Sequence, residues 1–196
     1  MTNPLDYNIS QLNTLQPKKG HLLIAEPFME DPYFKRSVIL LTGYGKDGVF
    51  GFILNKPLEI KINDVMKDFP EFDAPIYIGG PVDSDSLFYI HTQGEFIEGS
   101  IQISDKLYWS GNFNQLKKMI KNQEIFPSEI KFFIGYSGWD FNQLENEIKE
   151  DSWIISKIKS NVIADMNENE LWKNTLQKMG PKFSILSNFP EDPKLN

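Results

Sequence analysis

The sequence contains no cysteine and only two histidines, His21 and His91. The absence of cysteine excludes disulfide bonds, thiolate metal ligands and a cysteine nucleophile. Zinc sites need three or four ligands, usually His or Cys, and two isolated histidines do not supply them. The acidic residues leave a carboxylate-only Mg²⁺ site open. No pattern in the sequence points to such a site, so we expect no metal and no cofactor.

The chain also lacks a long hydrophobic run and a targeting signal. Its apolar stretches have the length of β-strands, which is too short for a transmembrane helix. The N-terminus, MTNPLDYNIS, has neither the basic start nor the apolar core of a signal peptide. We therefore expect a cytoplasmic protein without a membrane partner.

Basic residues are outnumbered by acidic ones, 20 to 27, and the net charge is −7. Proteins bind duplex DNA mainly by neutralising phosphates with Lys and Arg. The densest basic cluster is Lys117, Lys118 and Lys121, and Lys18 with Lys19 forms a second, smaller group. Both are typical of solvated surfaces. The composition thus argues against direct nucleic-acid binding.

The 196 residues, 40% hydrophobic and 24% charged, suit one globular domain with a substantial core. Residues 1–17 are polar, contain Pro4 and Pro17, and are expected to form an N-terminal arm. Residues 18–196 show neither an internal repeat nor a linker. We expect them to form a single domain that includes the C-terminal tail.

Local patterns predict the order of strands and helices. Apolar and β-branched runs predict strands at 21–25, 37–42, 49–54, 76–78, 87–91, 100–104 and 130–134, and extended pieces at 153–158 and 161–164. Asp47-Gly48 between two such runs predicts a hairpin. Periodicity predicts helices at 62–68, 112–123, 140–150 and 168–179, with Asn63, Asn112, Asp140 and Asn167 as N-caps. Hairpins with interspersed helices indicate an α+β fold with a mixed, largely antiparallel sheet.

The stretch FFIGYSGWDFNQLENEI, residues 132–148, has the order strand, sharp turn, serine, helix. That order is typical of a nucleophile elbow, Gly-x-Ser-x-Gly. Gly135 and Ser137 fit the motif, but Trp139 stands where a small residue is needed. Nothing in the sequence brings His91 and a carboxylate to Ser137. We therefore predict no catalytic residue here and favour a packed corner, with a ligand-binding notch as the alternative.

The structural interpretation accounts for more of the residues in this stretch. Asp140 and Gln143 have the spacing of a capping box, and Trp139 stands where an apolar residue can pack against the first helical turn. A second glycine turn, Gly79-Gly80-Pro81-Val82, allows another backbone or a ligand to come close. A tight turn is the favoured interpretation there too.

The same residues resemble the bacterial YqgE/AlgH family, whose signature is GYAGWxxGQLExEL. Four further blocks match in order: GHLLIAEPFMEDPYFKRSVILL, GVFGFILNKP, IYIGGPV with His91, and the helix of Trp172. The resemblance covers nearly the whole chain from Leu15. It implies a bacterial, cytosolic, single-domain α+β protein whose sheet curls into a partial barrel flanked by helices. The family has no agreed biochemical activity or catalytic residue. Its members carry the label of transcriptional regulator, so the resemblance implies a regulatory role.

The chain departs from this signature at two positions. Ser137 stands where the family usually has Ala, which argues further against a serine nucleophile. Asn142 stands where the family often has Gly, at the start of the expected helix.

Two functional hypotheses remain. In the first, the chain is a non-enzymatic regulatory or binding protein that acts through a protein or small-molecule partner. In the second, it is an enzyme or small-molecule-binding protein with a polar site near the Gly135–Trp139 turn. Polar residues at strand ends and turns of the matching blocks are the candidates for such a site: Asp31, Arg36, Asn55, His91, Tyr136 and Gln143. For most of them, capping or turn hydrogen bonds are the alternative role.

Overall fold

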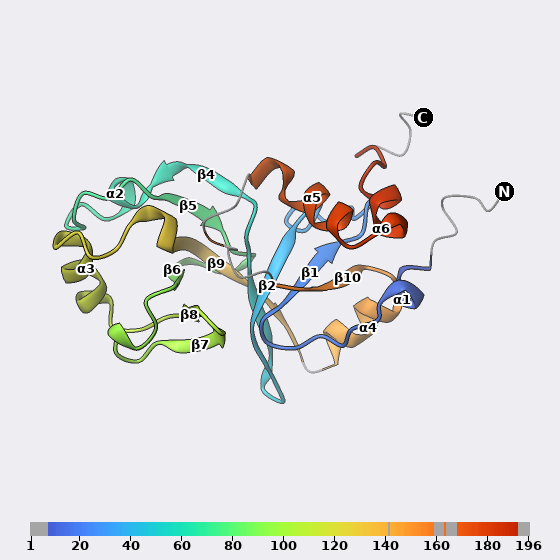
Figure 1. Cartoon of the computed structure of the whole chain (residues 1–196), viewed down its shortest axis with the longest axis horizontal. Helices are drawn as coiled ribbons and strands as arrows, with labels where there is room; N and C mark the ends of the chain where they lie inside the picture. The colour runs from blue at the N-terminus through green and yellow to red at the C-terminus, as the bar shows by residue number, and fades with distance from the viewer. Residues whose placement is uncertain (1–7, 141, 159–162, 164–167, 192–196) are drawn as a thin grey trace.

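A computed structural model describes residues 8–140, 142–158, 163 and 168–191, which form one α+β domain (Figure 1). Ten strands in this part of the chain make one sheet, and only the pair β5–β9 is parallel. The order along the main path is β10-β1-β2-β3-β9-β6-β8-β7, with β5 beside β9 and β4 beside β5. The strands are β1 (His21–Ala25), β2 (Val38–Gly45), β3 (Gly48–Ile53), β4 (Pro57–Lys61), β5 (Pro75–Ile78), β6 (Val82–His91), β7 (Ile101–Ser104), β8 (Leu107–Trp109), β9 (Ile130–Trp139) and β10 (Trp153–Lys157).

Strand β9 crosses the middle of the molecule and connects its two halves. Residues 130–136 pair with β6 on one edge, and residues 132–134 pair with β5 on the other. The last three residues, 137–139, pair with β3 instead. In Figure 1, strands β1, β2 and β10 lie on one side of this crossing, and β4 to β8 lie on the other. Most of β9 is buried because both of its faces are covered.

The sheet curls until strand β7 returns to β2. Gly20, which precedes β1, lies at this closure, because a Cβ built on it would be 3.0 Å from the carbonyl oxygen of Ile103. Ile103 and Leu107 from the returning strands join Leu22 and Leu40 in one apolar cluster inside the curled sheet. The predicted α+β fold with a largely antiparallel, partly barrel-like sheet is therefore confirmed.

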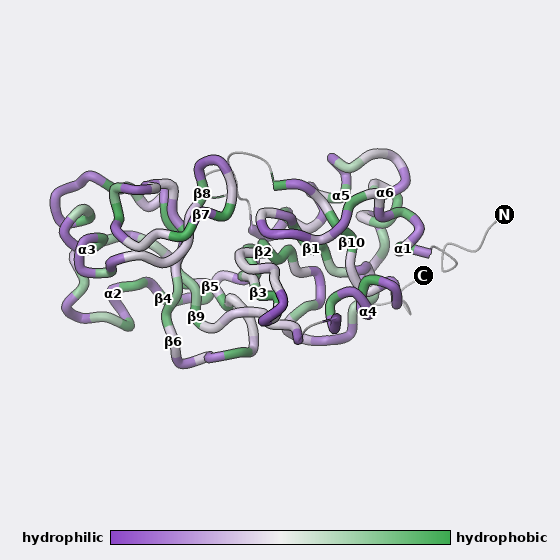
Figure 2. Tube along the Cα trace, turned by 90° about the horizontal axis from the view of Figure 1, so that it is seen from below, coloured by the Kyte–Doolittle hydropathy of each residue, from purple (hydrophilic) through white to green (hydrophobic). Residues whose placement is uncertain are grey.

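Helices cover the sheet on separate faces. Leu116 and Ile120 of α3 pack with Phe132 of β9, Leu144 of α4 packs over β1 to β3, and Trp172 of α5 closes the interior cluster. Figure 2 shows hydrophobic residues on the central strands and hydrophilic ones along outer loops. The helices are α1 (Ile9–Leu12), α2 (Ile62–Val65), α3 (Phe113–Lys121), α4 (Gln143–Lys149), α5 (Leu171–Lys178) and α6 (Pro181–Leu186), and the 3₁₀ turns are η2 (Gly94–Phe96), η3 (Pro127–Glu129) and η4 (Glu168–Glu170).

Most predicted elements are found, and the β2–β3 hairpin has its tip at Lys46 and Asp47. The sequence did not reveal β4, β8 or the first part of β6. Asn112 caps α3 as predicted, because its Oδ1 accepts hydrogen bonds from the backbone N–H groups of Asn114 and Gln115, both at 3.1 Å.

Two predicted helices differ from the structure. The helix at 62–68 ends at Val65, and Asn63 is not its cap. The Asn63 side chain instead donates to the Phe69 and Pro70 carbonyls and accepts from the N–H of Phe72. These hydrogen bonds stabilise a loop where helical periodicity predicted another turn.

The last predicted helix, at 168–179, is divided. It begins as the 3₁₀ turn η4 and continues as α5, and Pro181 then starts α6, which was not predicted. Proline fits the first turn of a helix because that turn needs no N–H donor. The expected cap Asn167 and most of the extended piece at 161–164 lie outside the described residues.

The described part of the predicted N-terminal arm contacts the domain. Ile9 of α1 is buried, and Asn13 forms hydrogen bonds with both the Trp153 carbonyl and the Ile155 N–H of β10. The division of the chain at residue 18 stays a prediction.

Candidate functional site

The GYSGW stretch belongs to strand β9, so the turn predicted at residues 135–139 is wrong. The strand continues to Trp139 because its last residues pair with β3, with Ser137 opposite Gly51 and Trp139 opposite Val49. Gly135 adopts φ 69°, a conformation that suits glycine, at the point where β9 changes partners. The strand thus bends without ending.

The glycines of β9 and of the β5–β6 connection lie backbone against backbone. A Cβ built on Gly79 would be 2.2 Å from the carbonyl oxygen of Gly135, and one on Gly135 would be 2.5 Å from that of Gly80. Ser137 is fully buried, and its hydroxyl donates to the Gly79 carbonyl at 3.0 Å. The close approach is therefore made by another chain segment, and the serine hydroxyl forms a structural hydrogen bond.

Helix α4 begins three residues later than predicted, at Gln143. Its N-cap is Asn142, which has φ 68°, a left-handed conformation that glycine and asparagine adopt more readily than other residues. Half of the predicted capping box is present, because the Gln143 Oε1 accepts from the N–H of Asp140 at 3.0 Å. Phe141 lies outside the described residues.

Glu147 of α4 holds this corner together. Its Oε2 accepts hydrogen bonds from the indole N–H groups of Trp139 at 2.8 Å and of Trp153 at 2.7 Å. Its Oε1 accepts from the Gln143 side chain at 2.9 Å. Both tryptophans are buried. The Trp139 ring stacks on the ring of Phe34, and the Trp153 ring contacts Phe34 edge-on. The tryptophans and the glutamate of this corner therefore have a packing role, and Gln143 forms structural hydrogen bonds.

His91 lies at the end of β6 and is fully buried. Its Nδ1 accepts from the backbone N–H of Gln93 at 3.2 Å, so the proton is on Nε2, which donates to the Ser110 carbonyl at 3.0 Å. Burial lowers the pKa of His91, and the hydrogen bond to Ser110 opposes that shift. His91 is a neutral residue with both ring nitrogens occupied.

Tyr136 and Asp31 also have local partners. The Tyr136 ring packs edge-on against Phe50 and Phe88 inside the curled sheet. The Asp31 carboxylate is exposed and accepts from the backbone N–H groups of Tyr33 and Phe34 at 2.8 and 3.1 Å, which is the geometry of an Asx turn.

Arg36 and Asn55 are the two candidates that line a common cavity, of about 330 Å³. Asn55 joins the strands beneath it, because its Oδ1 accepts from the N–H of Val38 and its Nδ2 donates to the Arg36 carbonyl, both at 2.9 Å. The Arg36 guanidinium lies 3.9 Å from the centre of the Trp172 ring. We call this cavity the Arg36 pocket; it is lined by Lys35, Arg36, Asn55, Lys56, Glu168, Asn169, Trp172, Lys173, Ser187, Phe189 and Glu191.

The six predicted site residues therefore do not form a single pocket. His91, Tyr136 and Gln143 form their contacts in other parts of the fold. Asp31 lies near Lys56 of the pocket, and its negative charge acts to raise the pKa of that lysine. Burial is the larger effect on Lys56 and lowers its pKa, and burial also lowers the pKa of Arg36. Arg36 and Lys56 are thus partly desolvated, which strengthens their attraction for an anion.

A second polar group, next to the Arg36 pocket, escaped the sequence analysis. Lys131 of β9 is buried, and its Nζ lies 3.3 Å from Glu168, which lines the pocket, and 3.6 Å from the centre of the Tyr77 ring. The Tyr77 hydroxyl donates to the same Glu168 carboxylate at 2.5 Å. Burial lowers the pKa of Lys131 to about 8, although Glu168 opposes this shift. One signal was available: Lys131 is a lone charge within the buried run IKFFI.

This lysine predicts a pH dependence of stability. In the folded chain its pKa, about 8, is below the ordinary 10.5. Between these values the unfolded chain holds a proton that the folded chain has released, so stability rises with pH. Across this window we expect Lys131 to contribute an increase of up to ~3 kcal/mol in the free energy of unfolding.

The measurement is urea unfolding from pH 7 to pH 10.5 for the natural chain and for Lys131→Met. The difference between the two curves isolates Lys131 from the tyrosines, such as buried Tyr89, whose pKa burial raises to about 12. Parallel curves for the two proteins would show that Lys131 titrates normally in the folded chain.

The described residues lack two features that would indicate a particular class of function. In this part of the chain, no group of three or more His, Asp or Glu side chains is arranged to hold a metal ion. No helix within the same residues is both long and apolar enough to cross a membrane.

These observations define a class: a single-domain α+β protein with a curled, largely antiparallel sheet and a basic pocket beside its C-terminal helices. A family model described as AlgH-like matches residues 22–184. The chain belongs to this family, for which no biochemical activity is established, and the predicted resemblance is confirmed.

Individual relatives agree with this assignment. A UPF0301 protein of Bacteroides fragilis is 43% identical over 187 residues, covering 95% of each chain. Another, from Parabacteroides distasonis, is 42% identical over 186 residues, covering 94% of each. A crystal structure of a protein from Corynebacterium diphtheriae has a TM-score of 0.77 at 21% identity, over 92% of this chain and 97% of that one. The solution structure of the AlgH protein from Pseudomonas aeruginosa has a TM-score of 0.68 at 25% identity, over 90% and 98%.

Proposed function

We propose that this chain is a non-enzymatic binding protein with a regulatory role, which takes an anionic group of a small ligand or protein partner at the Arg36 pocket. The observation that carries this proposal is the local charge. The chain as a whole has a net charge of −7. The described residues that line the pocket nevertheless include four cations, Lys35, Arg36, Lys56 and Lys173, against two carboxylates, Glu168 and Glu191. An excess of positive charge in a partly desolvated concavity favours an anionic ligand.

Binding is better supported than catalysis because the groups that could do chemistry have structural partners. The Ser137 hydroxyl is buried and donates a hydrogen bond to the Gly79 carbonyl, and both ring nitrogens of His91 are hydrogen-bonded. A general base must reach the proton that it abstracts, and a buried neutral histidine with two partners does not. The alternative, an enzyme or ligand site near Gly135–Trp139, has less support because that stretch is a packed strand.

The proposed place of action is the cytoplasm, and the proposed route to regulation is indirect. The YqgE/AlgH resemblance brings the label of transcriptional regulator, but an acidic chain without an extended basic surface is poorly suited to duplex DNA. Regulation through a small ligand or another protein fits the charge better. A gel-shift assay on duplex DNA at physiological salt is expected to show no complex.

The proposal predicts that small anions stabilise the protein. Thermal unfolding is measured with phosphate, dicarboxylates, nucleotides and phosphorylated metabolites, and with polyamines as cationic controls. A ligand at about 100 times its Kd stabilises by about 2.7 kcal/mol. For a chain of this length, that corresponds to a rise in Tm of roughly 5–10 °C. We expect such a rise from at least one anion and none from the polyamines.

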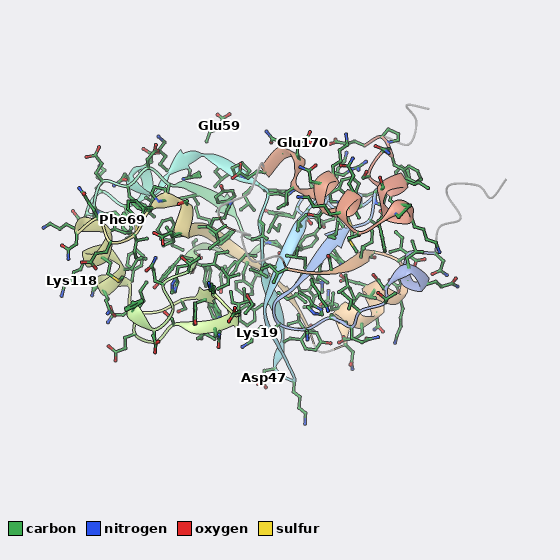
Figure 3. The ribbon with its side chains drawn as sticks, in the orientation of Figure 1. Lys19, Asp47, Glu59, Phe69, Lys118 and Glu170 are labelled. Atoms are coloured by element: carbon green, nitrogen blue, oxygen red, sulfur yellow. The ribbon has the colours of Figure 1, made fainter. Side chains whose placement is uncertain are left out.

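A double variant, Lys56→Gln with Lys173→Gln, is expected to abolish the shift, because it removes two pocket cations. Lys118→Gln is the matched control, since Lys118 lies on α3 at the opposite end of the molecule from α5 and α6 (Figure 3). An anion-induced shift that persists in the double variant would place the site elsewhere. A panel in which every anion leaves the Tm unchanged would contradict a small-anion site.

A further inference from the structure

The C-terminal strap, residues 188–191, begins in the turn that ends α6, where the N–H groups of Asn188 and Phe189 donate to the carbonyls of Ile185 and Leu186. Its last three residues contact side chains from the segment that precedes β2. The Phe189 ring stacks on Phe28 with 5.5 Å between centroids. The Arg36 Nη2 donates to the carbonyl oxygens of Phe189 and Pro190 at 2.7 and 2.8 Å. The Glu191 carboxylate lies 3.6 Å from the Lys35 ammonium. Three successive residues therefore each make a contact of a different kind: aromatic, main-chain and ionic.

None of these contacts depends on the covalent connection of the strap to the chain. Arg36 donates hydrogen bonds to main-chain carbonyl groups, which any peptide provides. The Phe28 ring accepts another aromatic ring, and Lys35 pairs with any carboxylate in reach. An independent segment with the order aromatic, proline, acidic would make the same contacts.

The protein holds Arg36 in place without the help of the strap. The backbone carbonyl of Arg36 accepts a hydrogen bond from Asn55, and its φ is 55°. The Arg36 guanidinium packs on the ring of Trp172. That ring is held in turn by a hydrogen bond of 2.8 Å from its indole N–H to the Ala25 carbonyl. The Arg36 Nε is buried and has no hydrogen-bond partner among the described residues. A donor that is already oriented and desolvated loses little entropy when it binds.

Phe189 lines two cavities. One is the Arg36 pocket. The other has a volume of about 410 Å³ and is bounded by Glu26, Phe28 and Leu186 among other residues. We call the two cavities that share Phe189 the Phe189 groove; its lining is basic around Arg36 and acidic around Glu26. A peptide, with its alternating donors and acceptors, suits a groove of mixed polarity.

We propose that the Phe189 groove binds an aromatic–proline–acidic segment of a protein partner, and that the chain's own strap occupies it as an intramolecular competitor. The inference rests on the proposed function, because it names the kind of partner whose acidic group reaches the Arg36 pocket. A short tether gives a competing segment an effective concentration in the millimolar range. An external peptide therefore binds the intact chain more weakly than a chain without the strap.

The test compares the full chain with a chain that ends at Asn188. The probe is a fluorescein-labelled peptide, Asn-Phe-Pro-Glu-Asp-Pro, followed by fluorescence polarisation. We expect the shortened chain to bind it with a Kd in the micromolar range and the full chain to bind at least about ten times more weakly. In the shortened chain, Arg36→Lys is expected to weaken binding at least about tenfold, because lysine cannot reproduce the planar two-carbonyl contact. Lys118→Gln in the same background should have no effect.

Peptide variants give a second readout. Replacing Phe with Ala, or Glu with Gln, in the probe should weaken binding to the shortened chain, because each change removes one of the strap's contacts. If the shortened chain does not give a cooperative thermal transition, the full-length double variant Phe189→Ala with Glu191→Gln replaces it.

Equal binding by the full and shortened chains would overturn the proposal, since the strap would then not occupy the site. Absence of binding by a cooperatively folded shortened chain would overturn it as well. The anion-dependent rise in Tm of the full chain is a separate result. If that rise is found while the peptide fails, a small-anion site stands and the peptide partner does not.

Discussion

Replacing Gly79 by alanine is expected to reduce the free energy of unfolding by more than about 4 kcal/mol, a large part of the roughly 5–15 kcal/mol that stabilises a typical domain. The methyl group would lie 2.2 Å from the Gly135 carbonyl oxygen and 3.1 Å from its carbonyl carbon. Both contacts are with backbone, which a rotamer change cannot relieve. Gly79 also ties the β5–β6 connection to two strands, because its N–H donates to Ile134 of β9 and its carbonyl accepts from Ile53 of β3 and from the Ser137 hydroxyl of β9.

Gly45→Ala is the matched control for this prediction. Gly45 lies in β2 near the hairpin tip, and apart from its own chain neighbours no atom of the described residues lies within 4 Å of a Cβ built on it. Neither Gly45 nor Gly79 has a positive φ, so alanine is compatible with both backbones and the two variants differ only in the space available. Urea unfolding followed by circular dichroism should place Gly45→Ala within about 0.5 kcal/mol of the natural chain. A Gly79→Ala protein with the same midpoint as the control would mean that β9 and the β5–β6 connection are not in close contact in solution.

These glycines show where sequence reasoning stops. The apolar runs and the Asp47-Gly48 hairpin could be predicted because alternation and turn chemistry are local. The close approach of Gly79 to Gly135 joins residues that are far apart in the chain, and the sequence records only that both are small. It could not show whether a ligand or another backbone fills the space. The same limit hid the closure of the sheet at Gly20.

The candidate site could be predicted only in part, for the same physical reason. Arg36 and Asn55 were identified as polar residues at strand ends, and they do line a pocket. The other walls of that pocket come from Trp172 and Phe189, and Arg36 meets the strap across 153 residues of sequence. His91 was identified only because a histidine can act as an acid or base. In the structure, both of its ring nitrogens form hydrogen bonds, with Gln93 and Ser110. Residue type indicates a capacity, and the partners in the fold determine whether that capacity is already used.

Replacing Glu147 by alanine is expected to cost ~2–5 kcal/mol of unfolding free energy, because it leaves the buried indole N–H groups of Trp139 and Trp153 without an acceptor. Each unsatisfied buried donor costs ~1–3 kcal/mol. The two rings are 5% and 1% exposed, so water does not readily replace the carboxylate. They meet edge to face with 5.9 Å between centroids, an arrangement that fixes both N–H groups toward Glu147. Urea unfolding followed by tryptophan fluorescence measures both the stability and the environment of these rings.

Glu147→Gln separates the hydrogen bonds from the charge. Its amide oxygen can accept from one or both indoles, so the loss should be smaller than for alanine, about 1–2 kcal/mol. The control is Glu150→Ala, which removes an exposed carboxylate just beyond the same helix and is expected to change stability by less than about 0.5 kcal/mol. If Glu147→Ala is as stable as Glu150→Ala, the indoles have other acceptors in solution. A loss that follows the order Ala, then Gln, then the control would show that this carboxylate joins α4 to β9 and β10, and that the signature residues of this stretch are kept for packing.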